Sequence, residues 1–134
     1  MSGRRSEWRS EIPATLDAIE EFCGEFQLWR PGACPGLDAF SAELLLREAL
    51  TNAVVHGGQQ GPHPHICSVL LRARPGRLLI AIKDQGDGFD WRAVWNHDAA
   101  LSDTNGRGIG IFRRYASSVR FNSKGNKILL VKRF

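Results

Sequence analysis

The chain has 134 residues, of which 43% are hydrophobic and 24% charged, as is typical of one compact domain of a water-soluble protein. No apolar run approaches the roughly 20 residues that a membrane-spanning helix requires, and the basic start MSGRRSEWRS is not followed by the apolar stretch of a signal peptide. We therefore expect a cytoplasmic protein that neither enters nor crosses a membrane.

The charge and the cysteines exclude further classes. The 18 Lys and Arg residues exceed the 14 Asp and Glu residues, for a net charge of +4, but they are scattered in small groups. This pattern predicts attraction to acidic ligands or partners and no direct nucleic-acid binding. Cys23, Cys34 and Cys67 are odd in number and lack a CxxC pair, which disfavours a disulfide framework and a zinc site. We expect reduced, partly buried thiols.

The first third of the chain predicts a strand and two helices. Residues 7–12 are expected to form a short strand that ends at Pro13. Apolar residues at helical spacing predict an amphipathic helix over residues 13–28, and residues 29–36, with two prolines and two glycines, predict a loop. Residues 37–56 give the strongest helix pattern in the chain, and two glycines stop it.

The middle of the chain predicts a hairpin. After a turn-rich loop over residues 57–64, two apolar runs at 66–73 and 77–83 are separated by Arg-Pro-Gly. Residues 84–90 form a glycine-rich exit from the second strand. Residues 90–104 are ambiguous and are compatible with a short helix and a mobile segment.

The remaining segment predicts a helix and a second hairpin. Residues 105–110 are expected to be a glycine-rich loop that opens a helix from about residue 109 to residue 116. Strands at 118–122 and 127–134 then follow, turned at Lys124, Gly125 and Asn126. Two hairpins with helices before and between them predict an α+β fold, a two-layer sandwich with helices on one face of the sheet.

The first motif that carries chemistry lies on the strong helix. Glu48, Asn52 and His56 are spaced i, i+4 and i+8, so they form one polar stripe on an otherwise apolar helix. An amide oxygen suits Mg²⁺, and a carboxylate one turn away can deprotonate a hydroxyl group or water. His56 either contacts a phosphate or caps the helix. The alternative for the whole stripe is a solvated face of a surface helix.

The second motif follows the strand over residues 77–83. Asp84 at the strand end can accept the exocyclic amine of adenine, while Gly86 and Gly88 permit positive φ and allow a planar base to approach the backbone. The alternative is a common acidic turn. A calcium loop of the EF-hand type is disfavoured because its downstream glutamate is absent.

The third motif is Gly106-Arg107-Gly108-Ile109-Gly110 at the expected start of a helix. Backbone N–H groups and the helix dipole attract phosphate there, and Arg107 can add a bidentate contact. The motif is neither a Walker loop nor a Rossmann fingerprint. The alternative is a flexible connector with an exposed arginine.

The ordered set, ExxxNAxxHG on a helix, DxGxG after a strand and GRGIG at a helix start, resembles the three nucleotide-binding boxes of the GHKL ATPase superfamily. The resemblance implies the Bergerat ATP-binding fold, a mixed sheet backed by helices with a lid over the nucleotide. It implies Mg²⁺ on Asn52, a general base in Glu48 and adenine on Asp84. The remaining nucleotide-binding residues that it implies are His56, Gly86, Gly88, Gly106, Arg107, Gly108, Ile109 and Gly110.

The length favours one branch of the superfamily. We expect residues 1–134 to form a single kinase domain, because the chain starts at Met1 and its final hairpin is complete. All four histidines lie within or after the first motif, which disfavours histidine autophosphorylation. The segment EALTNAVVHG and the length of the chain resemble those of the anti-sigma-factor serine/threonine kinases of bacterial partner switching. That resemblance implies ATP and ADP binding, a homodimer, and two partners, a sigma factor and a small STAS-type anti-sigma factor antagonist.

Two other functions remain open from the residues. One is a non-catalytic, nucleotide-gated binding module of the same fold, and the other is a histidine-kinase-like domain that acts on another protein. Glu48 favours the kinase, since a pure binder needs no general base. The residues leave both transcription and another process such as secretion open as the output. The loop with His63, Pro64 and His65, and the tryptophans Trp91 and Trp95 near the lid, are candidates for partner contacts.

Overall fold

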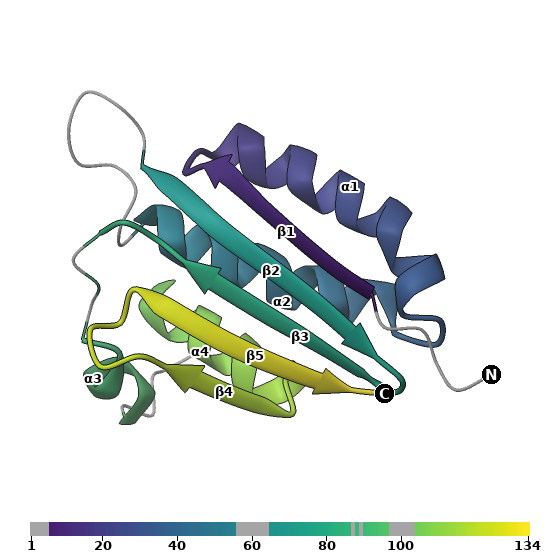
Figure 1. Ribbon diagram of the computed structural model, residues 1–134. Helices are drawn as coiled ribbons and strands as arrows, with labels where there is room; N and C mark the ends of the chain where they lie inside the picture. The colour runs from purple at the N-terminus through teal and green to yellow at the C-terminus, as the bar shows by residue number, and fades with distance from the viewer. Residues whose placement is uncertain (1–5, 56–64, 87, 89, 97–103) are drawn as a thin grey trace.

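The computed structural model describes residues 6–55, 65–86, 88, 90–96 and 104–134. Along the chain these residues form five strands and four helices (Figure 1). Their order is β1 (Ser6–Pro13), α1 (Leu16–Ala33), α2 (Ala39–Ala53), β2 (Ile66–Arg74), β3 (Arg77–Lys83), α3 (Trp91–Asn96), α4 (Thr104–Tyr115), β4 (Ser118–Phe121) and β5 (Lys127–Arg133).

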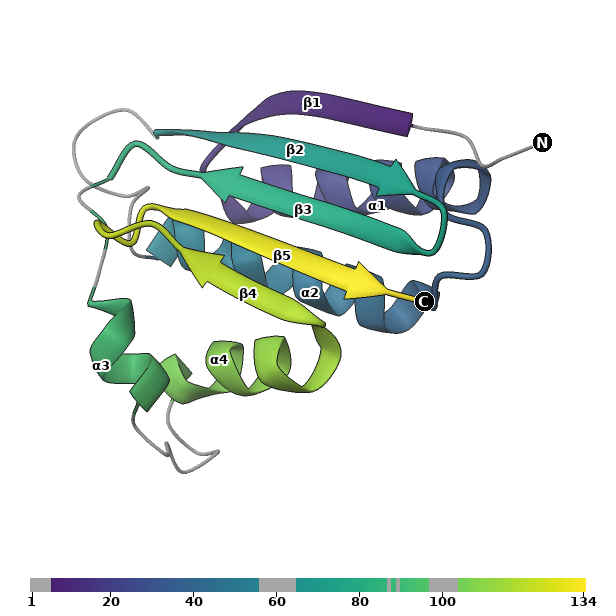
Figure 2. The same cartoon turned by 60° about the horizontal axis from the view of Figure 1, so that its bottom comes forward.

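The strands form one sheet in the order β1-β2-β3-β5-β4. Helices α1, α2 and α4 cover one face of this sheet, and the other face is open (Figure 2). The expected α+β sandwich with helices on one face is therefore confirmed. None of the helices in the described part of the chain combines the length and the apolar character that crossing a membrane requires.

The sheet is antiparallel at every pair of neighbouring described strands, so the expectation of a mixed sheet is wrong. The reason lies in the crossover from β3 through α3 and α4 to β4. Strands β3 and β4 run in the same direction, but they are not paired, because β5 turns back from β4 and lies between them. Strands β3 and β4 are thus parallel to each other, but no hydrogen bonds of a parallel pair join them.

The hydrophobic core lies between the sheet and the helices. Strand residues alternate in burial, so β2 buries Cys67, Val69, Leu71 and Ala73 on the helix side. Helices α1, α2 and α4 contribute side chains that are almost fully buried from solvent, among them Phe22, Phe26, Leu45, Leu46, Leu50 and Phe112. All three cysteines are free and buried, as the sequence predicted.

Helix α1 begins and ends later than the pattern indicated. Thr15 is its N-cap, and the hydroxyl oxygen accepts a hydrogen bond of 3.2 Å from the backbone N–H of Ala18. The helix then continues through Pro31 to Ala33, so the loop expected at residues 29–36 is wrong over most of its length. Because Pro31 lies in the last turn, its missing N–H removes only one bond near the helix end.

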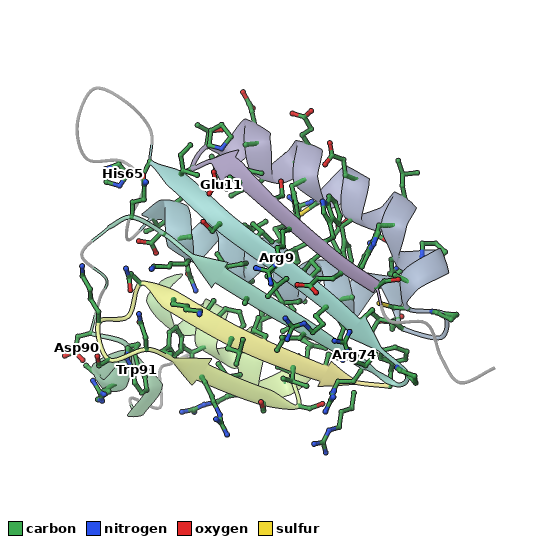
Figure 3. All side chains as sticks on the ribbon, viewed as in Figure 1. Arg9, Glu11, His65, Arg74, Asp90 and Trp91 are labelled. Carbon is green, nitrogen blue, oxygen red and sulfur yellow. The ribbon has the colours of Figure 1, made fainter. Side chains whose placement is uncertain are left out.

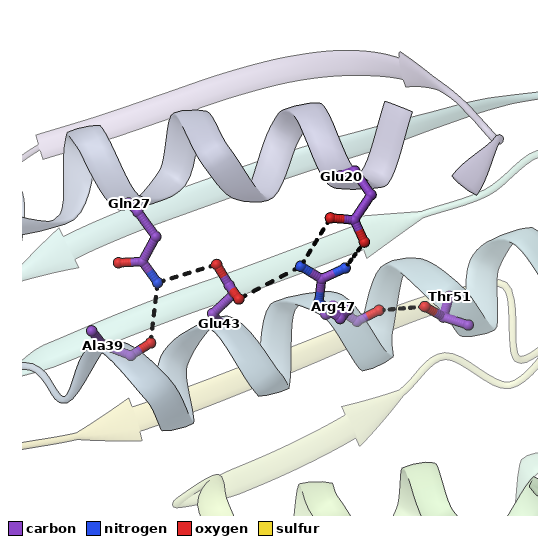
Figure 4. Close-up of polar contacts among 6 residues, drawn as sticks. All are labelled: Glu20, Gln27, Ala39, Glu43, Arg47 and Thr51. Atoms are coloured by element: carbon purple, nitrogen blue, oxygen red, sulfur yellow. Dashed lines mark hydrogen bonds and ion pairs between the residues drawn. The ribbon is translucent and has the colours of Figure 1, made fainter. Parts of the chain in front are cut away.

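A polar cluster joins α1 to α2 on the side away from the sheet (Figure 4). The guanidinium of Arg47 forms an ion pair with Glu20 of α1 and lies 3.5 Å from the carboxylate of Glu43 on its own helix. The side-chain amide of Gln27 donates to the Glu43 carboxylate at 3.3 Å and to the backbone carbonyl of Ala39 at 3.2 Å. These contacts fix how α2 lies along α1.

Helix α4 starts at Thr104, and the helix start expected near residue 109 is wrong. Glycines are poor helix formers, which is why the pattern favoured a loop there. Ile109 and Phe112 are buried in the core at 5% and 0% exposure. Ile109 and Phe112 are three residues apart and so lie on the same side of the helix. Their burial holds the helix on the sheet and outweighs the weak helix propensity of the glycines in its first turns.

Candidate functional site

A pocket opens between the end of α2 and the end of the sheet where β3 stops and β5 starts. Its volume is about 20 Å³, close to the space that one water molecule occupies, and it opens to solvent. Three segments that are distant in sequence contribute to its walls. They are α2 (Ala49, Asn52, Ala53), the end of β3 (Ile82, Asp84) and the β4–β5 hairpin (Phe121, Gly125, Asn126, Lys127, Ile128).

Asp84 supplies the buried acidic group of the pocket. It follows β3 directly and is only 6% exposed. One carboxylate oxygen accepts a hydrogen bond of 2.7 Å from the backbone N–H of Gly86. An ionised carboxylate only accepts hydrogen bonds, so a ligand that meets it must present a donor such as an amine. With Ala49, Ala53, Ile82 and Ile128 around it, the pocket combines apolar lining residues with this buried carboxylate.

Asn52 lies in the same pocket and comes from the last turn of α2. Its side chain is half-buried, and its amide oxygen is a donor atom of the kind that Mg²⁺ prefers. Within the described ranges no three His, Cys, Asp or Glu side chains gather as metal ligands.

Glu48 lies one turn before Asn52 on α2 and is also half-buried. The described lining of the pocket includes Asn52 but not Glu48. The pattern thus places both side chains on one helix, yet only the amide borders the pocket in this conformation. His56, the third member of the stripe, lies outside the described residues.

The two glycines of the second motif differ in role. Gly88 has a φ of +82°, while Gly86 is not among the glycines with positive φ. A Cβ atom built on Gly88 would overlap the backbone carbonyl of Lys124 in the β4–β5 turn. Gly88 is therefore required by the close approach of two backbone segments, and not only by the approach of a base.

The third motif lies at the start of α4. Gly106, Arg107 and Gly108 are in its first turns, and the side chain of Arg107 is outside the described part of the molecule. Ile109 points into the hydrophobic core, and Gly110 is half-buried. Residues 97–103 are likewise outside the described residues.

The β4–β5 hairpin contributes half of the pocket lining, which the motifs did not reveal. Its turn is organised by Asn122, whose side-chain oxygen accepts hydrogen bonds from the backbone N–H groups of Gly125, Asn126 and Lys127 at 2.8, 3.0 and 3.2 Å. The pattern did predict the turn at residues 124–126. No local signal shows that this turn returns to Asp84, because that contact is set by the order of the strands.

Trp91 attaches the start of α3 to the same hairpin. Its ring stacks on Phe121 with centroids 5.1 Å apart, and its indole N–H donates to the backbone carbonyl of Asn122 at 2.9 Å. Figure 3 shows Asp90 and Trp91 together at this end of the sheet. Trp91 thus packs beside the pocket wall, since Phe121 itself lines the pocket.

Comparison with known proteins gives the family and a set of relatives. The family model described as a histidine kinase-like ATPase domain matches residues 12–132. Three curated proteins named Serine-protein kinase RsbW, all from Staphylococcus epidermidis and two of them from named strains, are 27% identical to this chain over 81 residues. The alignment covers 56% of this chain and 51% of each relative, so the chain spans about half the length of the curated relatives it matches.

Proposed function

Because this chain belongs to the histidine kinase-like ATPase domain family, whose model covers residues 12–132, we propose that it binds ATP in the pocket beside Asp84. The observation that carries this proposal is the buried Asp84 carboxylate, which lies in an apolar pocket opposite a helix that presents Asn52. The exocyclic amine of adenine supplies the donor that this carboxylate needs, and the apolar walls suit the faces of the base.

The phosphates extend from the base toward α2 and the start of α4. Asn52 fits Mg²⁺ by the chemistry of its amide oxygen, and the ion would complete its shell with phosphate oxygens and water. When bound, Mg²⁺ neutralises charge on the phosphates of ATP. Arg107, Gly106, Gly108 and Gly110 are assigned to the phosphate side by their place in the third motif, and His56 by its place on the α2 stripe.

We further propose that the chain is an anti-sigma factor that phosphorylates a serine or threonine of a small STAS-type anti-sigma factor antagonist. The name Serine-protein kinase of the relatives supports transfer to serine. In this reaction the serine oxygen forms a bond to the γ-phosphorus while the bond from that phosphorus to the bridging oxygen breaks, which releases ADP. Glu48 takes the proton of the serine hydroxyl. The domain would span residues 1–134 and act in the cytoplasm.

One observation favours a second function, a nucleotide-gated binding module without transfer. Glu48 does not border the pocket that Asn52 lines, and a general base must come within hydrogen-bond reach of the proton that it removes. If Glu48 keeps this position with ATP and a partner bound, the chain would bind sigma factor and antagonist according to the nucleotide but transfer no phosphate.

The test is phosphoryl transfer from γ-labelled ATP in an extract of cells that contain the protein. We expect an acid-stable label on a small protein, lost with Glu48→Ala and kept with Glu43→Ala. Glu43 is the matched control because it lies on the same helix, in the Arg47 cluster and away from the pocket. Both variants are expected to retain ATP binding.

Two other outcomes would change the assignment. An acid-labile label would indicate a histidine-kinase-like domain, since phosphohistidine is hydrolysed in acid. ATP binding without any label would contradict the kinase and support the binding module. Failure of the wild-type protein to bind ATP would contradict the proposal as a whole.

A further inference from the structure

The open face of the sheet is more apolar than a solvated face requires. A sheet with one face in water normally alternates apolar and polar residues, yet β3 contains Leu78-Leu79-Ile80-Ala81-Ile82 and β5 contains Ile128-Leu129-Leu130-Val131. Such continuous runs are typical of strands that are covered on both faces. The described helices cover only one of them (Figure 2).

The strand register brings the outward apolar side chains together. Leu70, Ala81 and Leu129 are consecutive partners across β2, β3 and β5, and Leu79 and Val131 form the next row. Each of the leucines and Val131 is only partly exposed. They form an apolar stripe three strands wide, which we call the open-face stripe and which consists of Leu70, Leu79, Ala81, Leu129 and Val131.

A groove follows one side of this stripe. It has a volume of about 550 Å³ and is lined by residues of β1, β2, β3 and β5 that include Ser68, Leu70 and Ala81. Its lining also includes three cations, Arg9, Lys83 and Lys127, and one carboxylate, that of Glu11. The groove thus combines apolar side chains with an excess of basic ones.

The stripe is surrounded by cations. Arg9 pairs with Leu70 on β1, and Arg120 pairs with Leu129 on β4, so the central row begins and ends with an arginine. Figure 3 shows Arg9, Glu11 and Arg74 on this face. Among the described residues of the five strands, the basic side chains on it are Arg9, Arg72, Arg74, Arg77, Lys83, Arg120, Lys127 and Arg133, and the acidic ones are Glu7 and Glu11.

The few carboxylates do not offset this charge. Glu7 already pairs with Arg9 at 2.8 Å and with Arg72 at 3.5 Å, and these two arginines hold the pKa of its carboxyl below the usual range. The Nε atom of Arg72 is buried and has no hydrogen-bond partner among the described atoms. The face therefore offers donors and positive charge around an apolar centre.

We propose that the open face docks an acidic amphipathic helix of a partner protein. Neighbouring strands lie about 4.8 Å apart, so a stripe across three strands is about 10 Å wide, which is the diameter of one helix. Leucines on one side of that helix cover the open-face stripe, and glutamates on its flanks reach the surrounding arginines and lysines. The open face shares Lys127 with the lining of the pocket, but the inference does not depend on phosphoryl transfer.

Two other occupants fit the face less well. A second copy of this chain packed face to face would bring two mostly basic surrounds together, which is unfavourable. Single-stranded nucleic acid binds sheets by stacking bases on aromatic side chains, and the described outward residues of the five strands include none. The apolar centre thus favours a protein partner.

The probe is a synthetic helical peptide of about 18 residues, about 27 Å long, with leucine at positions i, i+3, i+4 and i+7 and glutamate elsewhere. We expect binding to the wild-type protein by fluorescence anisotropy at low salt. A scrambled peptide of the same composition has no apolar side, and a version with lysine in place of glutamate is repelled. We therefore expect both to bind at least about tenfold more weakly.

Variants of the face test where the peptide lies. We expect the double variant Arg9→Glu/Arg120→Glu and the single variant Leu129→Ser each to weaken peptide binding by about tenfold or more. The charge control is Arg114→Glu, because Arg114 is exposed on α4, away from the open face. ATP affinity is measured on the same variants. Retained ATP binding shows that they are folded and separates this proposal from the nucleotide proposal.

Three results would overturn the inference. The first is equal binding of the designed and scrambled acidic peptides, which would leave only charge attraction. The second is a wild-type homodimer in sedimentation equilibrium that Arg9→Glu/Arg120→Glu converts to a monomer, which would give the face to a second copy. The third is tighter binding of a single-stranded oligonucleotide than of the peptide, lost in the same double variant.

Discussion

Asp84 and Asn126 hold each other in place across 42 residues of sequence. The backbone N–H of Asp84 donates to the backbone carbonyl of Asn126 at 2.9 Å, and the side-chain amide of Asn126 donates to the backbone carbonyl of Asp84 at 3.3 Å. The residue proposed to bind adenine is therefore positioned by the β4–β5 hairpin.

Asp84→Asn is expected to weaken ATP binding by about 10- to 100-fold, the range for loss of a hydrogen bond to a charged group. The amide has one acceptor oxygen and one NH2 group in place of two acceptor oxygens. When its oxygen accepts from the N–H of Gly86, as the carboxylate does now, its NH2 group faces the amine of the base. Isothermal titration calorimetry measures the affinity for ATP. The matched control is Asp17→Asn, because Asp17 is an exposed residue in the first turn of α1. Unchanged affinity in Asp84→Asn would contradict the assignment of the adenine site.

Asn122→Ala is expected to lower the free energy of unfolding by about 1–3 kcal/mol, because it removes the side-chain acceptor of three backbone N–H groups of the turn. Of these three, the N–H of Gly125 keeps the backbone carbonyl of residue 122 at 3.2 Å. Urea denaturation measures the change. Asn122→Asp keeps the acceptor oxygen and is expected to restore most of the stability. We also expect Asn122→Ala to weaken ATP binding, because the turn positions Asn126. Unchanged ATP affinity in this variant would show that Asn122 serves only the local stability of the turn.

Gly88→Ala and Gly24→Ala are expected to have opposite effects. Alanine at position 88 requires a positive φ and places a Cβ atom against the Lys124 carbonyl, so the strand end must separate from the hairpin. We expect a lower melting temperature and weaker ATP binding. Gly24 lies inside α1 with open space around it, so alanine there is expected to stabilise by about 0.5–1 kcal/mol. If Gly24→Ala destabilised the protein as much as Gly88→Ala, the special need for glycine at position 88 would be contradicted.

The three cysteine thiols are expected to resist alkylation in the native state. Burial raises the pKa of Cys23, Cys34 and Cys67 from 9.0 to about 11, so at pH 8 they remain thiols and are shielded from reagents. Mass spectrometry after iodoacetamide treatment at pH 8 is expected to show no modification in buffer and three modifications in denaturant. A thiol that reacts quickly in buffer would show that its surroundings open under native conditions.

The same shift predicts a loss of stability in alkaline solution. Below pH 9 the thiols are neutral in the folded and the unfolded protein, so their full contribution to the free energy of unfolding is present. Above pH 9 the unfolded thiols ionise first, and the free energy of unfolding falls as the pH rises toward about 11. Cys67→Ala is expected to reduce this alkaline slope in urea denaturation curves, whereas an unchanged slope would place its cause in other groups.

Periodic patterns predicted the elements well where burial has a regular repeat. Strands β2, β3 and β5 alternate or run apolar between clear turn residues, and their predicted bounds agree closely with the structure. The predictions were wrong where tertiary packing overrides local preference. Pro31 and the glycines at positions 106 and 108 predict loops, yet α1 and α4 include them because Phe26, Ile109 and Phe112 are buried nearby.

The candidate site was half predictable. Asp84 and Asn52 belong to spaced motifs, and the structure brings both into one pocket. Phe121, Asn126 and Ile128 were not predicted to lie there, because their place depends on β5 pairing with β3 rather than on any neighbouring residue. The open-face stripe was also missed for this reason, since a one-dimensional pattern does not reveal which face the helices leave uncovered.

The position of β5 between β3 and β4 also bears on when the pocket can exist during folding. The β2–β3 and β4–β5 hairpins close locally, whereas β3 meets β5 only after the intervening helices have been made, with Lys83 opposite Lys127. A nascent chain that has emerged only as far as α4 therefore lacks one wall of the proposed ATP pocket. ATP would then select fully assembled molecules over partly folded ones, and would add its stabilisation only at the final docking of the hairpin.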